Sequence, residues 1–133
     1  MAHTTNYQST LITVAPDSAA TGGIVPSKPD SIAGRQYAML GAAPYAMTSD
    51  DLLFAVHAAR NGLPDTPEGR AAFFAKPQAC MRASPLPKQY GWGVHHDAGS
   101  HIALHAVGSA TYDRLLHDAA VKKVPAMRTK RAK

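Results

Sequence analysis

The segment from Cys80 to Val107, CMRASPLPKQYGWGVHHDAGSHIALHAV, decides which fold this sequence predicts. It contains the only cysteine, the only tryptophan and four of the seven histidines. Apolar residues alternate with small or polar ones on both sides of the turn-forming stretch 97–99. Because a period of two is typical of a strand with one buried face, the segment predicts a β-hairpin over residues 90–107.

The expected register follows from placing every apolar side chain of the hairpin on one face. With a three-residue turn, Trp92 faces Leu104, and His95 faces His101. A four-residue turn would set Trp92 against His105 and divide the apolar residues between two faces. Because a slip of one residue turns every side chain to the other face, burial favours the first register. The six residues that then share the buried face are Tyr90, Trp92, Val94, Ile102, Leu104 and Ala106.

The opposite face of the hairpin is rich in glycine and histidine. The glycines predict that another part of the same chain packs closely against this face. Two histidines across a pair of strands can hold a metal ion, but zinc normally takes three or four protein ligands. No HExxH or CxxC motif and no suitably spaced third ligand accompanies them, so the sequence predicts no metal and no cofactor. The residues of this face are Gly91, Gly93, His95, His101 and His105.

The rest of the chain alternates between helix signals and loops rich in glycine and proline. Helices are expected where Ser or Thr precedes an apolar stripe, and strands where β-branched residues cluster. This order predicts an α+β domain in two layers, with a mainly antiparallel sheet of three to five strands covered on one face by three or four helices. The expected elements are a strand at 7–14, helices at 31–41, 48–61 and 66–76, an extended piece at 80–82, a loop around Pro85 and Pro87, the hairpin, a helix from Ser109, and an edge strand at 121–127.

Asp50 and Asp51 follow Thr48 at the start of the second expected helix. Thr48 and Asp51 have the approximate spacing of a capping box, and carboxylates in a first turn interact favourably with the helix dipole. Two neighbouring carboxylates are also the residue types of a general acid and base. Because the first turn of a helix is sufficient to explain both carboxylates, Asp50 and Asp51 are predicted to have a structural role.

Length and composition predict one folded domain. A chain of 133 residues with 45% hydrophobic residues can bury a single core. One cysteine excludes an internal disulfide and fits a reducing compartment. No apolar run approaches the roughly 18 residues of a membrane span, and the N-terminus lacks the pattern of a secretory signal. We therefore expect a globular domain over 1–120, no membrane contact and a cytoplasmic location.

The positive net charge of +5 comes from the end of the chain. Residues 1–120 carry a net charge of −1, whereas the expected edge strand and tail at 121–133 carry +6. A basic tail can follow nucleic-acid phosphates by releasing counterions, or it can remain a solvated terminus without a partner. Its cations are Lys122, Lys123, Arg128, Lys130, Arg131 and Lys133.

Several short segments resemble those of a family of small bacterial proteins of unknown function. The resemblance spans nearly the whole chain and implies a single intact domain, but no activity, cofactor or catalytic residue. The segments are TSDD at 48–51, RASP at 82–85 and YGWGVH at 90–95, with Asn6-Tyr7 near the start and Ala126-Met127-Arg128 near the end.

The chemistry of the segment 82–95 favours a binding module for an anionic small molecule or a protein partner. Arg82 can contact a carboxylate or phosphate through two N–H groups, or it can form an ion pair with a helix carboxylate. Ser84 adds a hydroxyl group. The candidate ligand-binding residues are Arg82, Ser84, Lys88, Tyr90 and His95.

Two alternatives remain open. A small enzyme using Cys80 and a histidine would need a nearby cation or helix N-terminus to stabilise the thiolate. Non-specific nucleic-acid binding would use the basic tail. The sequence favours a binding module over an enzyme, and both alternatives stay open.

Overall fold

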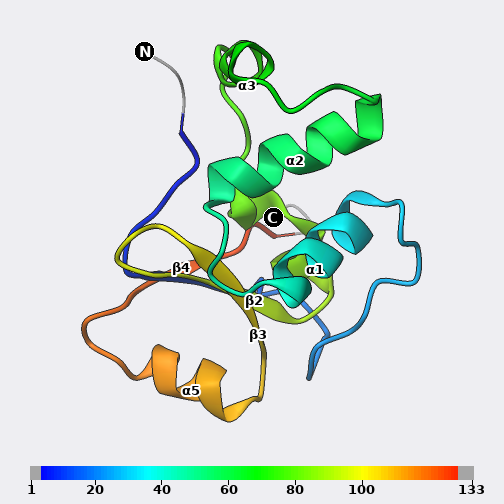
Figure 1. Cartoon of the computed structure of the whole chain (residues 1–133). Coiled ribbons are helices and arrows are strands. Elements are labelled where there is room, and N and C mark those ends of the chain that lie inside the picture. Colours follow the sequence, from blue (N-terminus) through cyan, green and yellow to red (C-terminus); the bar gives the residue numbers. More distant parts are fainter. Residues whose placement is uncertain (1–3, 129–133) are drawn as a thin grey trace.

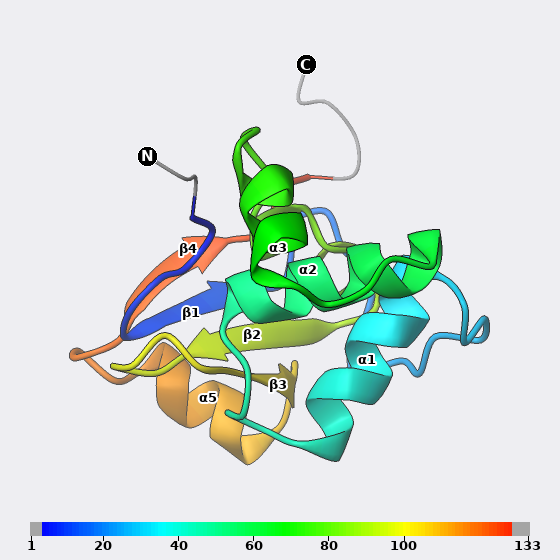
Figure 2. The same cartoon turned by 45° about the horizontal axis from the view of Figure 1, so that its top comes forward.

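Four short strands form one mixed sheet in the computed structural model, which describes residues 4–128. The strand order is β3 (Ile102–Ala106), β2 (Trp92–His96), β1 (Thr10–Thr13) and β4 (Lys122–Pro125). β2 is antiparallel to both β1 and β3, and β4 is parallel to β1 (Figure 2). The predicted α+β class with a mainly antiparallel sheet is confirmed.

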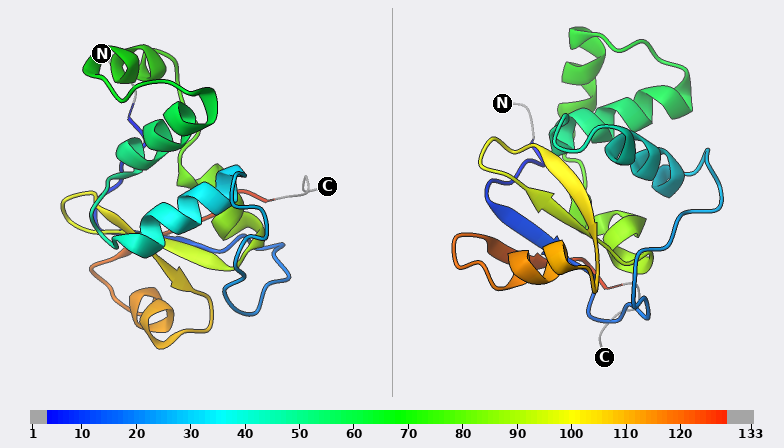
Figure 3. Two further views of the ribbon diagram at one scale, coloured as in Figure 1. Left: turned by 45° about the vertical axis from the view of Figure 1, so that its right-hand side comes forward. Right: turned by 60° about the horizontal axis from the view of Figure 1, so that its bottom comes forward.

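Helices lie on both sides of the sheet. α1 (Ile32–Ala42), α2 (Ser49–Asn61) and α3 (Pro67–Phe74) lie on one side, and α5 (Ala110–Leu116) lies on the other (Figures 1 and 3). α1 and α2 cover one face of the sheet, as expected, and α5 adds a layer on the opposite face. No helix within residues 4–128 has the length and apolar character to cross a bilayer.

The segment between α3 and the hairpin is more helical than expected. A 3-10 turn, η1 (Met81–Ala83), replaces the extended piece, and α4 (Pro85–Gln89) replaces the proline loop. Ser84 caps α4, because its hydroxyl accepts a hydrogen bond from the N–H of Leu86. Proline at the first position of a helix loses no hydrogen bond, so Pro85 begins α4 instead of breaking it.

Side-chain caps begin the four longer helical segments at the predicted residues. At α2, Thr48 and Asp51 form both hydrogen bonds of a capping box, and Gly62 ends the helix with a positive φ of 61°. Such caps satisfy N–H groups that have no partner within the helix. The capping residues of α1, α2, α3 and α5 are Ser31, Thr48, Thr66 and Ser109.

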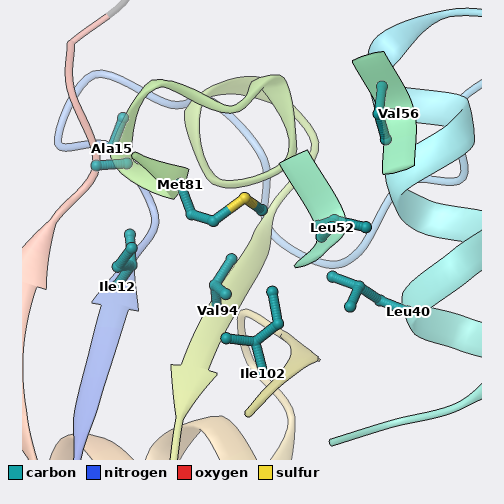
Figure 4. Close-up of a cluster of buried hydrophobic side chains, with 9 residues drawn as sticks. Ile12, Ala15, Leu40, Leu52, Val56, Met81, Val94 and Ile102 are labelled. Carbon is teal, nitrogen blue, oxygen red and sulfur yellow. The ribbon is translucent and has the colours of Figure 1, made fainter. Parts of the chain in front are cut away.

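The main core lies between the sheet and the first two helices (Figure 4). Met81 from η1 lies between the strand side chains and Leu52 of α2 in this view. Neighbouring residues of a strand point to opposite faces, so Ile12 enters this core and Leu11 enters a second cluster with Tyr112 of α5. The main core contains Ile12, Ala15, Leu40, Leu52, Val56, Met81, Val94, Ile102 and Ala126.

The hairpin register differs from the expected one by two residues. Trp92 pairs with Ala106 rather than Leu104, and His95 pairs with Ala103 rather than His101. The connecting loop therefore covers 97–101. Because a shift of two preserves the face of each side chain, the expected division between the two faces is retained.

Interactions around the loop account for its extra length. The Asp97 carboxylate accepts hydrogen bonds from the backbone N–H groups of Gly99 and His101, each at 2.9 Å. Ser100, rather than Gly99, adopts the left-handed conformation, with a φ of 69°. His101 forms a β-bridge with Thr48, which withdraws it from the hairpin ladder.

Close packing against the hairpin glycines is confirmed. A Cβ atom at Gly93 would lie 2.5 Å from the ring of Tyr112, and one at Gly91 would collide with the carbonyl group of Gly22. Gly91 also has a φ of 75°, which favours glycine. These glycines allow α5 and the loop before α1 to approach the sheet.

The folded part of the chain extends beyond residue 120. β4 is the expected edge strand, and Val121 and Ala126 on either side of it are buried. The N–H of Ala126 donates to the carbonyl of Thr13 at 2.9 Å. Lys130, Arg131 and Lys133 of the basic tail lie outside the described residues.

Candidate functional site

Arg82 and Ser84, two of the five predicted ligand-binding residues, form side-chain hydrogen bonds that join elements of the fold. The Arg82 side chain donates to the carbonyl of Pro125 at 2.7 Å, and the N–H of Met127 donates to the carbonyl of Arg82 at 2.9 Å. The hydroxyl of Ser84, 5% exposed, donates to Oε1 of Gln36 at 2.5 Å. These contacts join η1 and α4 to β4 and α1. Within residues 4–128, Arg82 forms no ion pair with a helix carboxylate.

The other three predicted residues are distributed along α4 and β2. Lys88 belongs to α4, and Tyr90 follows it, with its carbonyl accepting a hydrogen bond from the N–H of Ile24 at 2.8 Å. His95 pairs with Leu11, which places it on the sheet face that α5 covers. The five residues therefore do not converge on one point, and a role in ligand binding stays a prediction.

Three adjoining cavities lie between α1, α2, α3 and the segment 78–85. Their volumes are about 210, 260 and 420 Å³. The 210 Å³ cavity shares Leu53 and Ala79 with the 260 Å³ cavity, and it shares His57 and Phe73 with the 420 Å³ cavity. Because the linings overlap, the three cavities are neighbours, and together they are here called the helical groove.

The lining of the helical groove combines apolar side chains with two cations. Arg60 borders the 210 Å³ cavity, and Lys76 borders the 420 Å³ cavity. Neither forms an ion pair with a residue of the described part of the chain, and none of the lining residues there is acidic. The apolar side chains are Ile32, Leu53, Val56, Leu63 and Phe73.

Cys80 lies at one end of the helical groove. It borders the 260 Å³ cavity and a further cavity of about 310 Å³ beneath residues 4–7. Its sulfur lies 3.3 Å from the hydroxyl of Tyr7, and burial together with this contact raises the pKa of Tyr7 to about 12. Among residues 4–128 no histidine hydrogen-bonds to the thiol. The Tyr7 ring instead packs edge-on against His96, with ring centroids 5.2 Å apart.

His96 is buried without a hydrogen-bond partner. Its side chain is fully enclosed, and neither ring nitrogen has a partner in hydrogen-bonding geometry among the described residues. Burial lowers its pKa to about 4, although the backbone of Val94 and Thr10 acts in the opposite direction. His96 is therefore neutral at pH 7 and is a poor candidate for a base in contact with a substrate.

The carboxylates of Asp50 and Asp51 have structural partners. Asp50 accepts hydrogen bonds of 2.7 Å from the hydroxyl of Thr4 and from both the hydroxyl and N–H of Thr5. Asp51 forms an ion pair with Arg70 at 2.7 Å. Burial opposes ionisation of Asp51, but its hydrogen bonds and this ion pair lower its pKa overall. Asp51 thus serves the start of α2, whereas Asp50 holds the N-terminal segment against this helix.

A second polar group, here called the Tyr45 cluster, lies on the sheet face that carries α5. The hydroxyl of Tyr45 is 2.8 Å from Nδ1 of His95 and 2.9 Å from Nε2 of His105. His95 and His105 are diagonal neighbours on β2 and β3, and their ring centroids are 6.2 Å apart. Two imidazoles therefore converge on one phenol.

Local packing holds the Tyr45 cluster in an uncharged state. Burial lowers the pKa of His95 and of His105, and it raises the pKa of Tyr45. Asp97 strengthens the effect on Tyr45, and Arg114 opposes it. Because all three shifts favour the neutral forms, the cluster contains a phenol and two neutral imidazoles at pH 7.

The backbone of Tyr45 is strained where it joins the sheet. Its φ is 58°, a conformation that is rare for a bulky residue and costs on the order of 1–3 kcal/mol. The N–H of Tyr45 donates to the carbonyl of Ile102 at 2.9 Å, and this bond fastens the loop to the edge of β3. Sequence reasoning missed Tyr45 because it reaches the sheet from an irregular loop. The available signal was that His95 and His105 share one face.

The chain belongs to a family of unknown function, DUF6157, whose model matches residues 2–132. This match confirms that the resemblance extends over nearly the whole chain. No curated protein and no solved structure matches it.

Proposed function

We propose that the protein is a binding module for a small molecule with an apolar body and an anionic head, held in the helical groove. The observation that carries this proposal is a group of neighbouring, mainly apolar cavities, lined by two cations that form no ion pair within residues 4–128 and by no carboxylate. The sequence predicted an anionic ligand near Arg82. The proposed ligand is also anionic, but Arg60 and Lys76, instead of Arg82, are the cations that would contact it.

The size and lining of the helical groove support a small-molecule ligand. Ligand pockets are typically about 300–1,000 Å³ and are lined mostly by apolar side chains with a few polar groups. The individual cavities of about 210, 260 and 420 Å³ approach or fall within this range. Gln36 and Ser84 supply polar groups on the α1 side of the groove.

The charge of the groove favours an anion. Arg60 and Lys76 border neighbouring cavities that share His57 and Phe73. An unpaired guanidinium or ammonium group gains more from a carboxylate or phosphate than one already in an ion pair. The amino-acid sequence of 1–120 as a whole carries a net charge of −1, so this local excess of positive charge is not a property of the whole body.

Decanoate and decanol provide a matched test, because they share an apolar chain and differ in charge. Calorimetric titration should show binding of decanoate, and much weaker binding of decanol. Changing both Arg60 and Lys76 to Gln should weaken decanoate binding about tenfold, which corresponds to about 1.4 kcal/mol. Lys28→Gln, at an exposed lysine outside the groove lining, is the control and should leave binding unchanged. Equal binding of decanol, or no binding of decanoate, would contradict the proposal.

The tail supports nucleic-acid binding as a second candidate function. The observation in its favour is that Lys122 and Arg128 are exposed at and beyond the edge strand β4. Lys123 contributes less, because its ammonium group donates to the carbonyl groups of Asp118 and Val121.

A further inference from the structure

The Tyr45 cluster brings three potential metal-binding atoms to one point. A phenol has a single proton, so it can donate to only one of the two imidazole nitrogens, and the other must donate an N–H to the phenol oxygen. Each ring nitrogen nevertheless lies within 2.9 Å of that oxygen. The two rings are thus held with one nitrogen each directed at a common position.

We propose that Tyr45, His95 and His105 form a binding site for a divalent transition-metal ion, with the Tyr45 phenolate as the anionic donor. Two imidazoles and one anionic oxygen are a donor set that suits first-row ions such as zinc and cobalt. Water would take the remaining position. Within residues 4–128 no three His, Cys, Asp or Glu side chains are placed to hold a metal, so the phenolate is the required third ligand.

The distances in the cluster are close to those of an occupied site. Zinc lies about 2.0–2.2 Å from nitrogen and oxygen ligands, which places tetrahedral donors about 3.3 Å apart. The hydroxyl of Tyr45 lies 2.8 and 2.9 Å from the two nitrogens, about 0.5 Å less than this spacing. Tyr45 is 37% exposed, so an ion can reach it from solvent. No large cavity is needed for a single ion.

The protonation states balance without a further reactant. At pH 7 both imidazoles are neutral and can offer a lone pair, and the phenol releases one proton to solvent when its oxygen bonds to the ion. The Asp97 and Asp118 carboxylates act on His95 and favour a cation. The positive charge of Arg114 lies near Tyr45 and His105. It favours the Tyr45 phenolate but repels a bound metal ion.

The cluster also explains why the sequence indicated no metal site. The expected register paired His95 with His101, and no third ligand accompanied that pair. The observed register instead brings His105 beside His95, and the loop before α2 supplies the phenol. The sequence predicted no metal because it paired His95 with His101, and the fold does not contain that pair.

Titration of the metal-free full-length protein with zinc and cobalt chlorides tests the proposal. We expect one ion per chain, release of a proton, and the ultraviolet difference band of a tyrosinate, with a visible cobalt spectrum typical of four ligands. His95→Gln and His105→Gln should each weaken zinc binding by at least about tenfold. His117→Gln, at an exposed histidine outside the cluster, should leave it unchanged.

Tyr45→Phe separates a metal site from a purely structural cluster, because it keeps the ring and the backbone hydrogen bond. This variant should lose the tyrosinate band and bind zinc more weakly. Absence of zinc binding by the unaltered protein, or binding that persists unchanged in the His95 and His105 variants, would overturn the proposal. Binding by the unaltered protein without the tyrosinate band would overturn it equally.

Discussion

At the scale of single residues, His96 shows how burial alone sets a protonation state. The ring lies in a central strand, and no side chain of residues 4–128 offers its nitrogens a partner. In the unfolded chain its pKa is about 6.5, and in the folded protein it is about 4. The unfolded state therefore takes up a proton at a pH where the folded state does not.

The stability of the protein should fall as the pH decreases through this window. Above pH 6.5 His96 is neutral in both states and has no effect. Between pH 6.5 and pH 4 only the unfolded state is protonated, so the free energy of unfolding should decrease by about 3 kcal/mol from this residue. Urea denaturation at several pH values measures this decrease, to which His95 and His105 add in the same direction.

Replacement of His96 by leucine should flatten that pH profile. Leucine has a similar volume and no polar atoms, so it removes the titration together with two unpaired nitrogens. We expect stability at pH 7 to be maintained or raised. His117→Leu, at an exposed histidine, should leave the profile as it is. An unchanged slope in the His96 variant would show that other groups cause the loss.

At the scale of elements, hydrophobic patterns and caps were predictable, whereas the hairpin register was not. Alternation along β2 and β3 defines which face a residue occupies, and this was correct for both strands. Register also depends on the side chain of Asp97 and on the bridge between Thr48 and His101. The hydrogen bonds of Asp97 are local, but the bridge joins distant parts of the chain, and no local pattern contains it. The Tyr45 cluster was missed for the same reason.

Gly93→Ala should destabilise the contact between the sheet and α5. The new Cβ would lie 2.5 Å from the Tyr112 ring, and that ring is anchored because its hydroxyl accepts a hydrogen bond from the N–H of Val14. Overpacking of this kind costs about 1–3 kcal/mol. Gly41→Ala in α1 meets no atom within 4 Å and should instead stabilise the protein by about 0.5–1 kcal/mol. Urea denaturation of both variants measures this difference in sign.

Asp50→Ala should release the N-terminal segment from α2. The substitution removes three hydrogen bonds that Thr4 and Thr5 donate to one buried carboxylate. We expect a loss of about 2–4 kcal/mol and faster proteolysis near residues 4–6. Asp65→Ala, at an exposed aspartate before α3, should change stability by less than about 0.5 kcal/mol. Equal effects of the two substitutions would count against this role of Asp50.

At the scale of the whole molecule, the distribution of charge was predictable but the end of the folded part was not. The sequence shows a body of net charge −1 and a basic terminus. It does not show that Ala126 is buried in the main core or that Met127 bonds to Arg82. Truncation after Pro125 would remove both contacts, so Met127 is the appropriate end point.

A chain ending at Met127 should stay folded and lose most affinity for duplex DNA. It retains Lys122 and Lys123 but lacks the four cations that follow. For the full chain, six phosphate contacts limit the slope of log affinity against log salt to about −5, and the truncated chain should show about −2 at most. Binding measured at two salt concentrations tests this. Sequence-specific binding that survives truncation would instead place recognition in the body.

The parallel pairing of β1 with β4 has a consequence for how the chain is made. Thr10 finds its partner Lys122 only after more than 100 further residues have been translated. At about 5–20 residues per second, β1 is translated roughly 6–20 s before that partner. Until then one edge of β1, which carries the buried residues Leu11 and Ile12, lacks its partner strand. Nascent chains should therefore depend on chaperones that shield short apolar strands, and stalled translation before residue 121 should yield aggregates.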